Sequence, residues 1–311
     1  MRCLVTGAAG FIGSTLSERL LELGHEVVGV DCLTDYYSPE IKKANLSSAA
    51  SSPRFSLIEA DLLDLDLRGL LEGVDWVFHQ AAQPGVRMSW GDHFDVYVRN
   101  NVLATQRLLE AAKGSGIKRL VNASSSSVYG DLPELPLTET ARPQPVSPYG
   151  VTKLAAEHLC CLYYANYGVP TVSLRYFTVY GPRQRPDMGF HIFTSAALRG
   201  EEVVIYGDGE QTRDFTYISD VVMANVQAAE SEKAAGRVLN IGGGSRISVN
   251  AVLDILRDLI GGFEVRHVEA QKGDVRDTMS DTTAAREALG FSPKVSIAEG
   301  LKRQVEWMRS G

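Results

Sequence analysis

The segment Gly7-Ala8-Ala9-Gly10-Phe11-Ile12-Gly13 decides the fold of this chain. It follows an apolar run at residues 3–6 that is typical of a buried strand, and it precedes a segment in which Leu16, Leu20 and Leu23 share one helical face. Glycines at a strand-to-helix turn let the backbone approach a pyrophosphate, and the start of the helix offers free N–H groups and a positive dipole end. The segment therefore predicts the phosphate-binding turn of a dinucleotide site.

An acid at the end of the second predicted strand indicates which dinucleotide binds. Asp31 closes an apolar run at residues 26–31. A carboxylate there accepts hydrogen bonds from the ribose 2′-hydroxyl and repels a 2′-phosphate, so we expect NAD in preference to NADP. Asp61, just after the predicted strand at 55–60, is placed to meet adenine. Capping the start of a helix is an alternative role for this aspartate.

Short apolar runs alternate with amphipathic segments over the first 176 residues. Several of the runs are apolar nearly throughout, as in strands buried on both faces of a parallel sheet. The predicted strands are residues 3–6, 26–31, 55–60, 76–79, 119–123 and 171–176. The long helices of this half are expected at 94–113 and 149–167. This order predicts an α/β fold with a doubly wound parallel sheet of the Rossmann type.

The rest of the chain has a looser pattern. Its predicted elements are helices at 190–199, 218–231, 249–260 and 297–308 and strands at 203–205 and 238–241. We expect residues 1–176 to form a dinucleotide-binding domain and residues 177–311 a smaller substrate-binding domain. Part of 214–241 is expected to return to the first domain.

Composition argues against several classes of protein. Apolar residues make up 44% and charged residues 22% of the 311, which are ordinary values for a globular protein. No apolar run approaches the ~18 to 20 residues that span a bilayer, and a net charge of -7 argues against nucleic acid as a partner. Four cysteines without metal or framework spacing favour a reducing cytoplasm. The early strand leaves no signal peptide, and we expect no metal.

Tyr149-Gly150-Val151-Thr152-Lys153 is a second candidate motif. It opens a predicted helix, so Tyr149 and Lys153 share one face. Free tyrosine, with a pKa of about 10, is a poor base at pH 7. A lysine cation and an oxidised nicotinamide beside it would lower that pKa. The run Ser124-Ser125-Ser126-Ser127 follows the strand at 119–123, where hydroxyls reach the ligand crevice of such sheets.

Together the glycine motif, the serine run and the Tyr149/Lys153 pair resemble the extended short-chain dehydrogenase/reductases. Within them, the chain is similar to nucleotide-sugar epimerases of the UDP-galactose 4-epimerase type. Asp208-Gly209-Glu210-Gln211-Thr212-Arg213-Asp214-Phe215 and Asn240-Ile241-Gly242-Gly243-Gly244 match the second domain of that family. The resemblance implies a UDP-sugar substrate, NAD that stays bound, and a homodimer that pairs the predicted helices at 94–113 and 149–167.

The resemblance also implies a role for individual residues. Ser125 would hydrogen-bond the sugar 4-hydroxyl, Tyr149 would be the general base, and Lys153 would hold the nicotinamide ribose. The residues that it places around the cofactor are Gly7, Gly10, Phe11, Ile12, Asp31, Asp61, Leu62, Gln80, Ala81, Ala82, Gln83, Asn100, Tyr149, Lys153 and Tyr176. Around the nucleotide end of the substrate it places Arg213 and Arg276 at the diphosphate and Val204 and Tyr206 beside uracil. For Val204, an ordinary core position is the alternative.

Two departures from the hexose epimerases concern the sugar. Thr178 stands where those enzymes usually carry Asn, and Arg183-Gln184-Arg185-Pro186-Asp187-Met188 resembles the subgroup that acts on UDP-glucuronate. Tyr36-Tyr37 and Pro84-Gly85-Val86-Arg87 fit the same subgroup, which makes Arg87 a candidate substrate residue. The C5 carboxylate would then meet Ser126, Ser127, Thr178 and Arg185. A solvated basic loop is the alternative for Arg185.

We therefore favour inversion at C4 of UDP-glucuronate, giving UDP-galacturonate through a 4-keto intermediate. One alternative is a UDP-glucose/UDP-galactose 4-epimerase. Another is a UDP-glucuronate decarboxylase or a nucleotide-sugar dehydratase of the same fold. Those lyases usually carry acids in this stretch, whereas this chain has Ser127 within a run of serines. This chain therefore has no acid there to assist a second chemical step. A non-catalytic NAD-binding protein is the last alternative, and the intact Ser125, Tyr149 and Lys153 argue against it.

Overall fold

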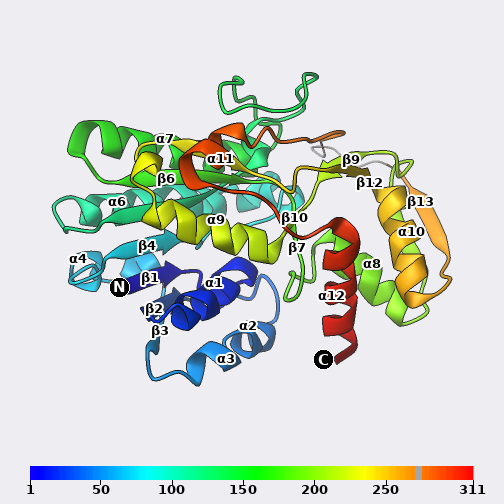
Figure 1. The fold of residues 1–311 in the computed structure, drawn as a ribbon, viewed down its shortest axis with the longest axis horizontal. Coiled ribbons are helices and arrows are strands. Elements are labelled where there is room, and N and C mark those ends of the chain that lie inside the picture. Colours follow the sequence, from blue (N-terminus) through cyan, green and yellow to red (C-terminus); the bar gives the residue numbers. More distant parts are fainter. Residues whose placement is uncertain (270–274, 311) are drawn as a thin grey trace.

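The computed structural model describes residues 1–269 and 275–310, and a parallel sheet lies at its centre (Figure 1). Within these residues the sheet has seven strands, in the order β11-β6-β5-β4-β1-β2-β3. The strands are β1 (Arg2–Thr6), β2 (Glu26–Asp31), β3 (Phe55–Glu59), β4 (Trp76–His79), β5 (Arg119–Ser125), β6 (Thr171–Tyr176) and β11 (Val238–Ile241). Every neighbouring pair is parallel. The predicted doubly wound fold is confirmed.

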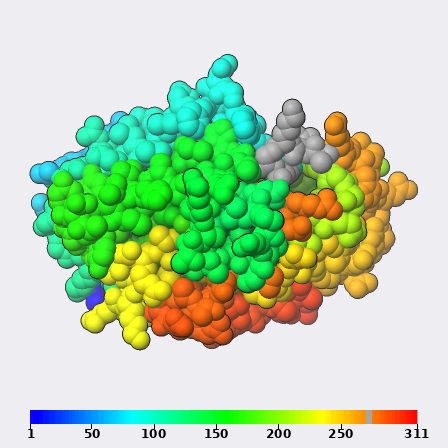
Figure 2. Space-filling model, turned by 90° about the horizontal axis from the view of Figure 1, so that it is seen from above, coloured from blue at the N-terminus to red at the C-terminus, as the bar shows by residue number. Residues whose placement is uncertain are grey.

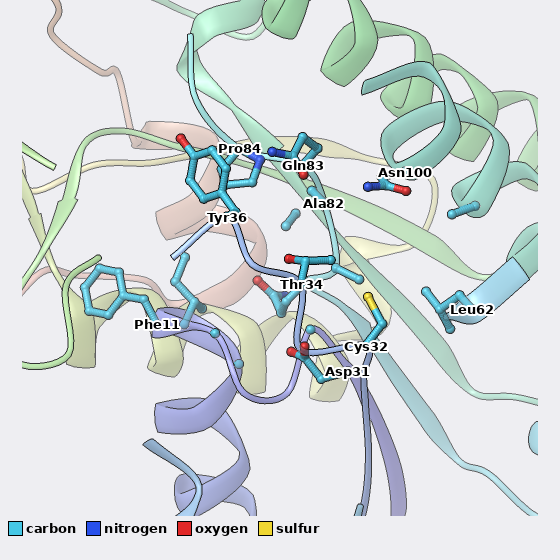
Figure 3. Close-up of a pocket in the computed structure, with 18 of the residues that line it drawn as sticks. Phe11, Asp31, Cys32, Thr34, Tyr36, Leu62, Ala82, Gln83, Pro84 and Asn100 are labelled. Carbon is cyan, nitrogen blue, oxygen red and sulfur yellow. The ribbon is translucent and has the colours of Figure 1, made fainter. Parts of the chain in front are cut away.

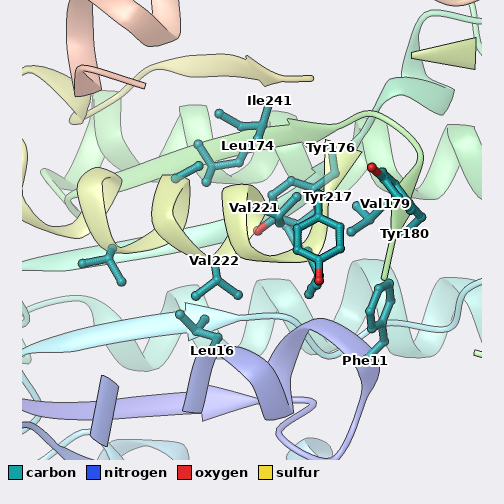
Figure 4. Close-up of a cluster of buried hydrophobic side chains, with 14 of the residues drawn as sticks. Phe11, Leu16, Leu174, Tyr176, Val179, Tyr180, Tyr217, Val221, Val222 and Ile241 are labelled. Carbon is teal, nitrogen blue, oxygen red and sulfur yellow. The ribbon is translucent and has the colours of Figure 1, made fainter. Parts of the chain in front are cut away.

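Helices cover both faces of this sheet. α1 (Phe11–Glu22) and α9 (Ile218–Glu230) pack on one face, and α4 (Leu67–Leu70), α6 (Ala104–Ala112) and α7 (Pro148–Tyr167) pack on the other. Because successive side chains of a strand point to opposite faces, Cys3 and Val5 of β1 join the apolar cluster under α1 and α9, while Leu4 joins the cluster under α6 and α7. Figure 4 shows the first cluster, in which Leu16 lies beside Val222.

The helix that the sequence predicts at 94–113 is not one regular helix. α5 (Phe94–Tyr97) leads into a π-helical segment, η4 (Val98–Leu103), before α6 begins. The wider turn carries Asn101, whose buried side chain accepts from the Gln83 N–H at 2.7 Å and donates to the Gln83 carbonyl at 3.1 Å. Its amide also donates to Thr152 Oγ1 at 3.0 Å. The π segment therefore ties the backbone after β4 to the first turns of α7.

A second group of elements lies at one end of the molecule (Figures 1 and 2). It comprises α8 (Gly189–Leu198), β8 (Val203–Tyr206), β9 (Thr212–Asp214), β12 (Arg246–Ser248), α10 (Val249–Ile260), β13 (Val265–Val268) and α12 (Ile297–Ser310). The same half of the chain also supplies α9 and β11, which lie on the central sheet. Outside residues 270–274 and 311, no helix has both the length and the apolar character that crossing a membrane requires.

The remaining elements are short and connect these layers. They are α2 (Pro39–Asn45), α3 (Ser47–Ala50), η1 (Leu62–Asp64), η2 (Arg87–Ser89), η3 (Gly91–His93), η5 (Ser126–Val128), β7 (Val179–Tyr180), β10 (Thr216–Tyr217), η6 (Glu232–Ala234) and α11 (Thr283–Leu289). Several of them follow the carboxyl ends of the central strands. Ligands of doubly wound sheets bind at that edge, where the connections diverge to the two faces.

Candidate active site

The glycine turn between β1 and α1 requires glycine for steric reasons. Gly7 has φ +68°, and a Cβ there would come within 2.7 Å of the Ala81 backbone nitrogen. A Cβ at Gly13 would lie 2.1 Å from the Gly7 carbonyl oxygen. The turn therefore brings the start of α1 and the backbone after β4 into close approach. This is the form of a site for a bound phosphate group.

Asp31 stands at the carboxyl end of β2 and is fixed by the backbone around it. Its Oδ2 accepts from the Ala9 N–H at 3.0 Å, and its Oδ1 accepts from the Leu33 N–H at 2.8 Å. A carboxylate has lone pairs beyond these two contacts. Asp31 therefore keeps acceptor capacity on the cavity that it lines, next to the glycine turn.

Of the two roles that the sequence left open for Asp61, the structure shows the capping of a helix. Its Oδ1 accepts from the Leu63 N–H at 2.9 Å and caps η1, while its Oδ2 pairs with Arg99 at 2.9 Å. Asp61 also lines the same cavity as Asp31, so the capping role does not exclude contact with adenine. Arg99 lies in η4 and was not singled out from the sequence.

One cavity contains all the residues that were assigned to the cofactor. They are Gly7, Gly10, Phe11, Ile12, Asp31, Asp61, Leu62, Gln80, Ala81, Ala82, Gln83, Asn100, Tyr149, Lys153 and Tyr176. Figure 3 shows Asp31 and Leu62 in the lower part of the view and Tyr36 and Gln83 in the upper part. Lining residues that the sequence did not assign to the cofactor include Cys32, Thr34, Tyr36, Tyr37, Lys42, Pro84 and Arg185. Most of these come from the β2–α2 loop, whose path no periodic pattern predicts.

Tyr149 and Lys153 enter the cavity from the first turns of α7. Pro148 opens this helix, and the Ser147 hydroxyl caps it by accepting from the Gly150 N–H at 3.1 Å. Burial raises the pKa of Tyr149 above its ordinary value, while the Arg185 charge and a hydrogen bond with Ser125 act in the opposite direction. From the sequence, Lys153 and an oxidised nicotinamide were expected to lower the pKa of Tyr149. In the structure Arg185 and Ser125 have that role.

Burial lowers the pKa of Lys153 to about 8, and the nearby Cys160 and Glu157 partly oppose this change. Glu157 is one helical turn farther along α7 and forms a buried ion pair with Arg175 of β6, at 2.6 Å between Nη2 and Oε1. The Ser124 hydroxyl donates to Glu157 Oε2 at 2.7 Å. The ion pair therefore fixes the end of β5 against α7, directly before Ser125.

Arg185 lies in the loop between β7 and α8 and lines the cavity with Tyr149. It forms two hydrogen bonds with Asp187, each of 2.9 Å, from Nε to Oδ1 and from Nη2 to Oδ2. Only 20% of its side chain is exposed. Arg185 is therefore mostly buried and paired where it borders the cavity, which favours the substrate role over the solvated loop.

The other candidate substrate residues lie outside the cavity lining. Arg87 and Tyr206 meet, with the guanidinium carbon 4.3 Å from the ring centre, and Arg213 donates to the Arg276 carbonyl at 2.6 Å. Ser126 and Ser127 form η5, and Ser127 donates its N–H to the Ser125 hydroxyl at 3.1 Å. Thr178 follows β6, and Val204 lies half-buried in β8. The structure thus brings Arg87 to Tyr206 and Arg213 to Arg276, but none of these nine residues, Ser125 included, lines the cavity.

A metal role finds no support in the part of the chain that the structure describes. No group of His, Cys, Asp and Glu side chains there could hold an ion. His79, at the end of β4, is buried between the hydroxyls of Thr6 at 2.8 Å and Thr105 at 3.0 Å. Burial lowers its pKa to about 3, so it stays neutral and structural.

The model of the NAD dependent epimerase/dehydratase family matches residues 3–242 of the chain. The chain belongs to this family. A relative from Bacillus subtilis, named uncharacterized UDP-glucose epimerase YtcB, is 44% identical over 100% of this chain and 98% of its own length. A UDP-glucuronate 4-epimerase from Thermodesulfobacterium geofontis is 40% identical over 98% of this chain and 95% of its own.

Solved structures of nucleotide-sugar epimerases are also similar to this chain. The UDP-glucuronic acid 4-epimerase from Bacillus cereus, in complex with UDP-glucuronic acid and NAD, is 43% identical, covers 100% of this chain and 99% of its own, and superposes with a TM-score of 0.97. The resemblance to nucleotide-sugar epimerases is therefore confirmed over the full length. Asp31, Tyr149, Lys153 and Arg185 all line this one cavity.

Proposed function

We propose that this chain is an NAD-dependent epimerase that inverts C4 of UDP-glucuronate to give UDP-galacturonate. The preference for a charged sugar rests on the position of Arg185. Arg185 lines the same cavity as Tyr149, and its positive charge lowers the pKa of the Tyr149 hydroxyl. C4 and C5 are adjacent carbons, so a base at the C4 hydroxyl has the C5 substituent close by. A carboxylate there gives the guanidinium an anionic partner, and a neutral hydroxymethyl group does not.

Sequence identity alone does not select the sugar. Relatives that are 44% and 40% identical to this chain carry UDP-glucose and UDP-glucuronate in their names. The choice therefore depends on the side chains that surround the sugar, where Arg185 favours the uronate.

The cavity fits NAD on three observations. At Gly7 the backbone leaves no room for a side chain, which lets a pyrophosphate come close to the start of α1. The Asp31 carboxylate keeps acceptor capacity for the ribose 2′-hydroxyl and disfavours a 2′-phosphate. Lys153 lines the same cavity as a buried amine. Bound there, NAD would supply the redox chemistry of a reversible hydride transfer at C4 of the sugar.

The protein moves the proton. Tyr149 takes the proton of the C4 hydroxyl, and Ser125, which is hydrogen-bonded to Tyr149, orients that hydroxyl. The Arg185 charge and the Ser125 hydrogen bond favour the tyrosinate against the effect of burial. With a pKa of about 8, Lys153 is largely protonated at pH 7 and serves as the donor to the nicotinamide ribose.

Inversion requires the 4-keto sugar to turn within the site while its carboxylate is kept. A 4-keto uronate is a β-keto acid, which loses carbon dioxide fastest when the carboxylate bond is perpendicular to the carbonyl plane. Short hydroxyl donors from Ser126, Ser127 and Thr178 can serve two orientations of the ring. Arg185 stabilises the carboxylate charge that decarboxylation must disperse. These contacts retain the carboxylate, and no acid in this stretch assists a second step.

We also propose that the enzyme is a cytoplasmic homodimer. The helices that would pair expose apolar side chains that a monomer leaves in water: Phe94 of α5, Val98 and Leu103 of η4, and Val151 and Leu162 of α7. Residues 1–176 would bind the cofactor, and most of 177–311 would bind the uridine end through Tyr206 and Arg213.

A panel of UDP-sugars with separation of the products tests the proposal. The expected result is that UDP-glucuronate gives UDP-galacturonate with higher kcat/KM than UDP-glucose gives UDP-galactose. Faster turnover of UDP-glucose would establish the hexose epimerase instead. A UDP-pentose would establish the decarboxylase. No turnover of any nucleotide sugar would establish a binding protein.

A further inference from the structure

Two loops meet over the cofactor cavity. One is the β2–α2 loop, residues 32–38, and the other is the β7–α8 loop, residues 181–188. Tyr36 of the first loop donates its hydroxyl hydrogen to Asp187 Oδ2 of the second at 3.1 Å. Tyr36 and Arg185 both line the cavity, so the contact between the loops borders the space that NAD would fill. Figure 3 shows Tyr36 beside Pro84.

Asp187 joins this contact to Arg185, which lines the cavity with Tyr149. It accepts two hydrogen bonds of 2.9 Å from Arg185 in addition to the one from Tyr36. The Arg185 guanidinium carbon lies 5.9 Å from the centre of the Tyr36 ring. Of the five N–H groups of an arginine, two face Asp187, which leaves three for a substrate. Asp187 therefore fixes the direction of Arg185 without using up its donors.

Both loops are also attached to the rest of the protein. Arg183, in the β7–α8 loop, pairs with Glu18 of α1 at 2.8 Å. On the other side, a Cβ at Gly85 would lie 2.4 Å from the Tyr36 hydroxyl, so the Tyr36 ring is packed against this backbone. Tyr97 donates to the Gly85 carbonyl at 2.9 Å and meets the Tyr149 ring edge-on. The two loops are therefore held between α1 on one side and Tyr149 on the other.

We propose that Tyr36 and Asp187 form a clasp that closes the two loops over bound NAD and holds Arg185 toward Tyr149. Both are positioning residues in this account. The inference rests on the proposed function, because an epimerase regenerates its cofactor in every cycle and has no need to release it. Opening the loops breaks a hydrogen bond to a carboxylate, which is stronger than one between neutral groups. The clasp therefore slows the loss of NAD.

The rate at which bound NAD exchanges with free NAD tests the clasp and does not require turnover of a UDP-sugar. Protein loaded with NAD is mixed with an excess of isotope-labelled NAD, and the bound nucleotide is separated at intervals and analysed by mass spectrometry. In Tyr36→Phe the ring remains and the hydrogen bond to Asp187 is lost, so we expect exchange to be roughly 10-fold faster or more. Tyr167→Phe is the matched control, because Tyr167 is an exposed tyrosine at the end of α7. A parental exchange rate in Tyr36→Phe overturns the clasp.

A double variant separates the clasp from a general loss of stability. Asp187→Ala should also speed exchange, and Tyr36→Phe/Asp187→Ala should exchange no faster than Asp187→Ala alone, because the contact is already absent. Asp254→Ala, on the exposed surface of α10, is the control for the aspartate change. Additive effects of the two changes contradict the clasp. The two proposals can fail separately. If the parent protein makes no UDP-galacturonate, but exchanges NAD slowly and the variants exchange it faster, the proposed function is refuted and the clasp is supported.

Discussion

Arg185→Ala tests whether the cation in the cavity recognises a uronate. A hydrogen bond between charged groups contributes about 1.5–3 kcal/mol, and each 1.4 kcal/mol is tenfold in affinity. Removing the guanidinium should therefore weaken binding of UDP-glucuronate by about 10- to 150-fold. In this variant Asp187 loses both of its hydrogen bonds to Arg185. Its unpaired carboxylate then repels the carboxylate of UDP-glucuronate, which weakens binding further. UDP-glucose has no carboxylate, so its affinity should change by less than about threefold.

Titration calorimetry of the NAD-loaded protein with each UDP-sugar measures the two affinities directly. Arg257→Ala is a matched control, because that arginine pairs with Asp254 on the exposed face of α10. The double variant Arg185→Ala/Asp187→Ala removes the repulsion and isolates the lost bond. Equal losses for the two sugars would refute the argument and would place Arg185 on the diphosphate.

The same change has an effect on pH dependence. The Arg185 charge lowers the pKa of Tyr149, and burial raises it. Without Arg185, burial acts with less opposition and the pKa of Tyr149 rises. Because Tyr149 acts as a base when deprotonated, the rising limb of kcat against pH should move to higher pH for both sugars. A limb that stays in place or moves to lower pH would show that Arg185 does not act on the base.

Other residues give independent tests. Asp31→Ala should let NADP compete with NAD, because the carboxylate that repels a 2′-phosphate is gone; an unchanged ratio of the two dissociation constants would contradict this role. Tyr149→Phe should lower turnover roughly 100- to 10,000-fold with NAD still recovered on denaturation, and near-parental turnover would exclude Tyr149 as the base. Glu157→Gln breaks the buried pair with Arg175 and should lower the free energy of unfolding in urea by about 3–5 kcal/mol. Glu299→Gln, in an exposed pair, should lower it by less than about 1 kcal/mol, and equal effects would refute the argument.

The residues predicted to bind the cofactor line one cavity, and this was predictable because they carry local signals. Gly7 follows a buried strand, Asp31 ends another, and Tyr149 opens a helix next to a proline. Strand ends in a parallel sheet meet at one edge, so local motifs were enough to bring these residues together. The strands at Glu26–Asp31, Trp76–His79, Thr171–Tyr176 and Val238–Ile241 have the predicted bounds.

The parts that were not predicted depend on contacts between distant segments. β9 and β12 are each three residues long and pair with each other although they are distant in the sequence. Each is too short to show the alternation of apolar and polar residues that predicts a strand. The π-helical turn of η4 follows from what Asn101 contacts, not from the apolar spacing of the helix. The pairing of Tyr36 with Asp187 joins residues 151 positions apart. No local sequence signal indicated that these two side chains would meet.

The most direct test of the central claim follows the carboxylate through the reaction. UDP-glucuronate labelled with carbon-13 at C6 is incubated with the purified protein and observed by NMR until the signals stop changing. We expect a mixture of UDP-glucuronate and UDP-galacturonate that holds all of the label in carboxylate signals. Labelled carbon dioxide with a UDP-pentose, or an unchanged substrate spectrum beside active turnover of UDP-glucose, would contradict it.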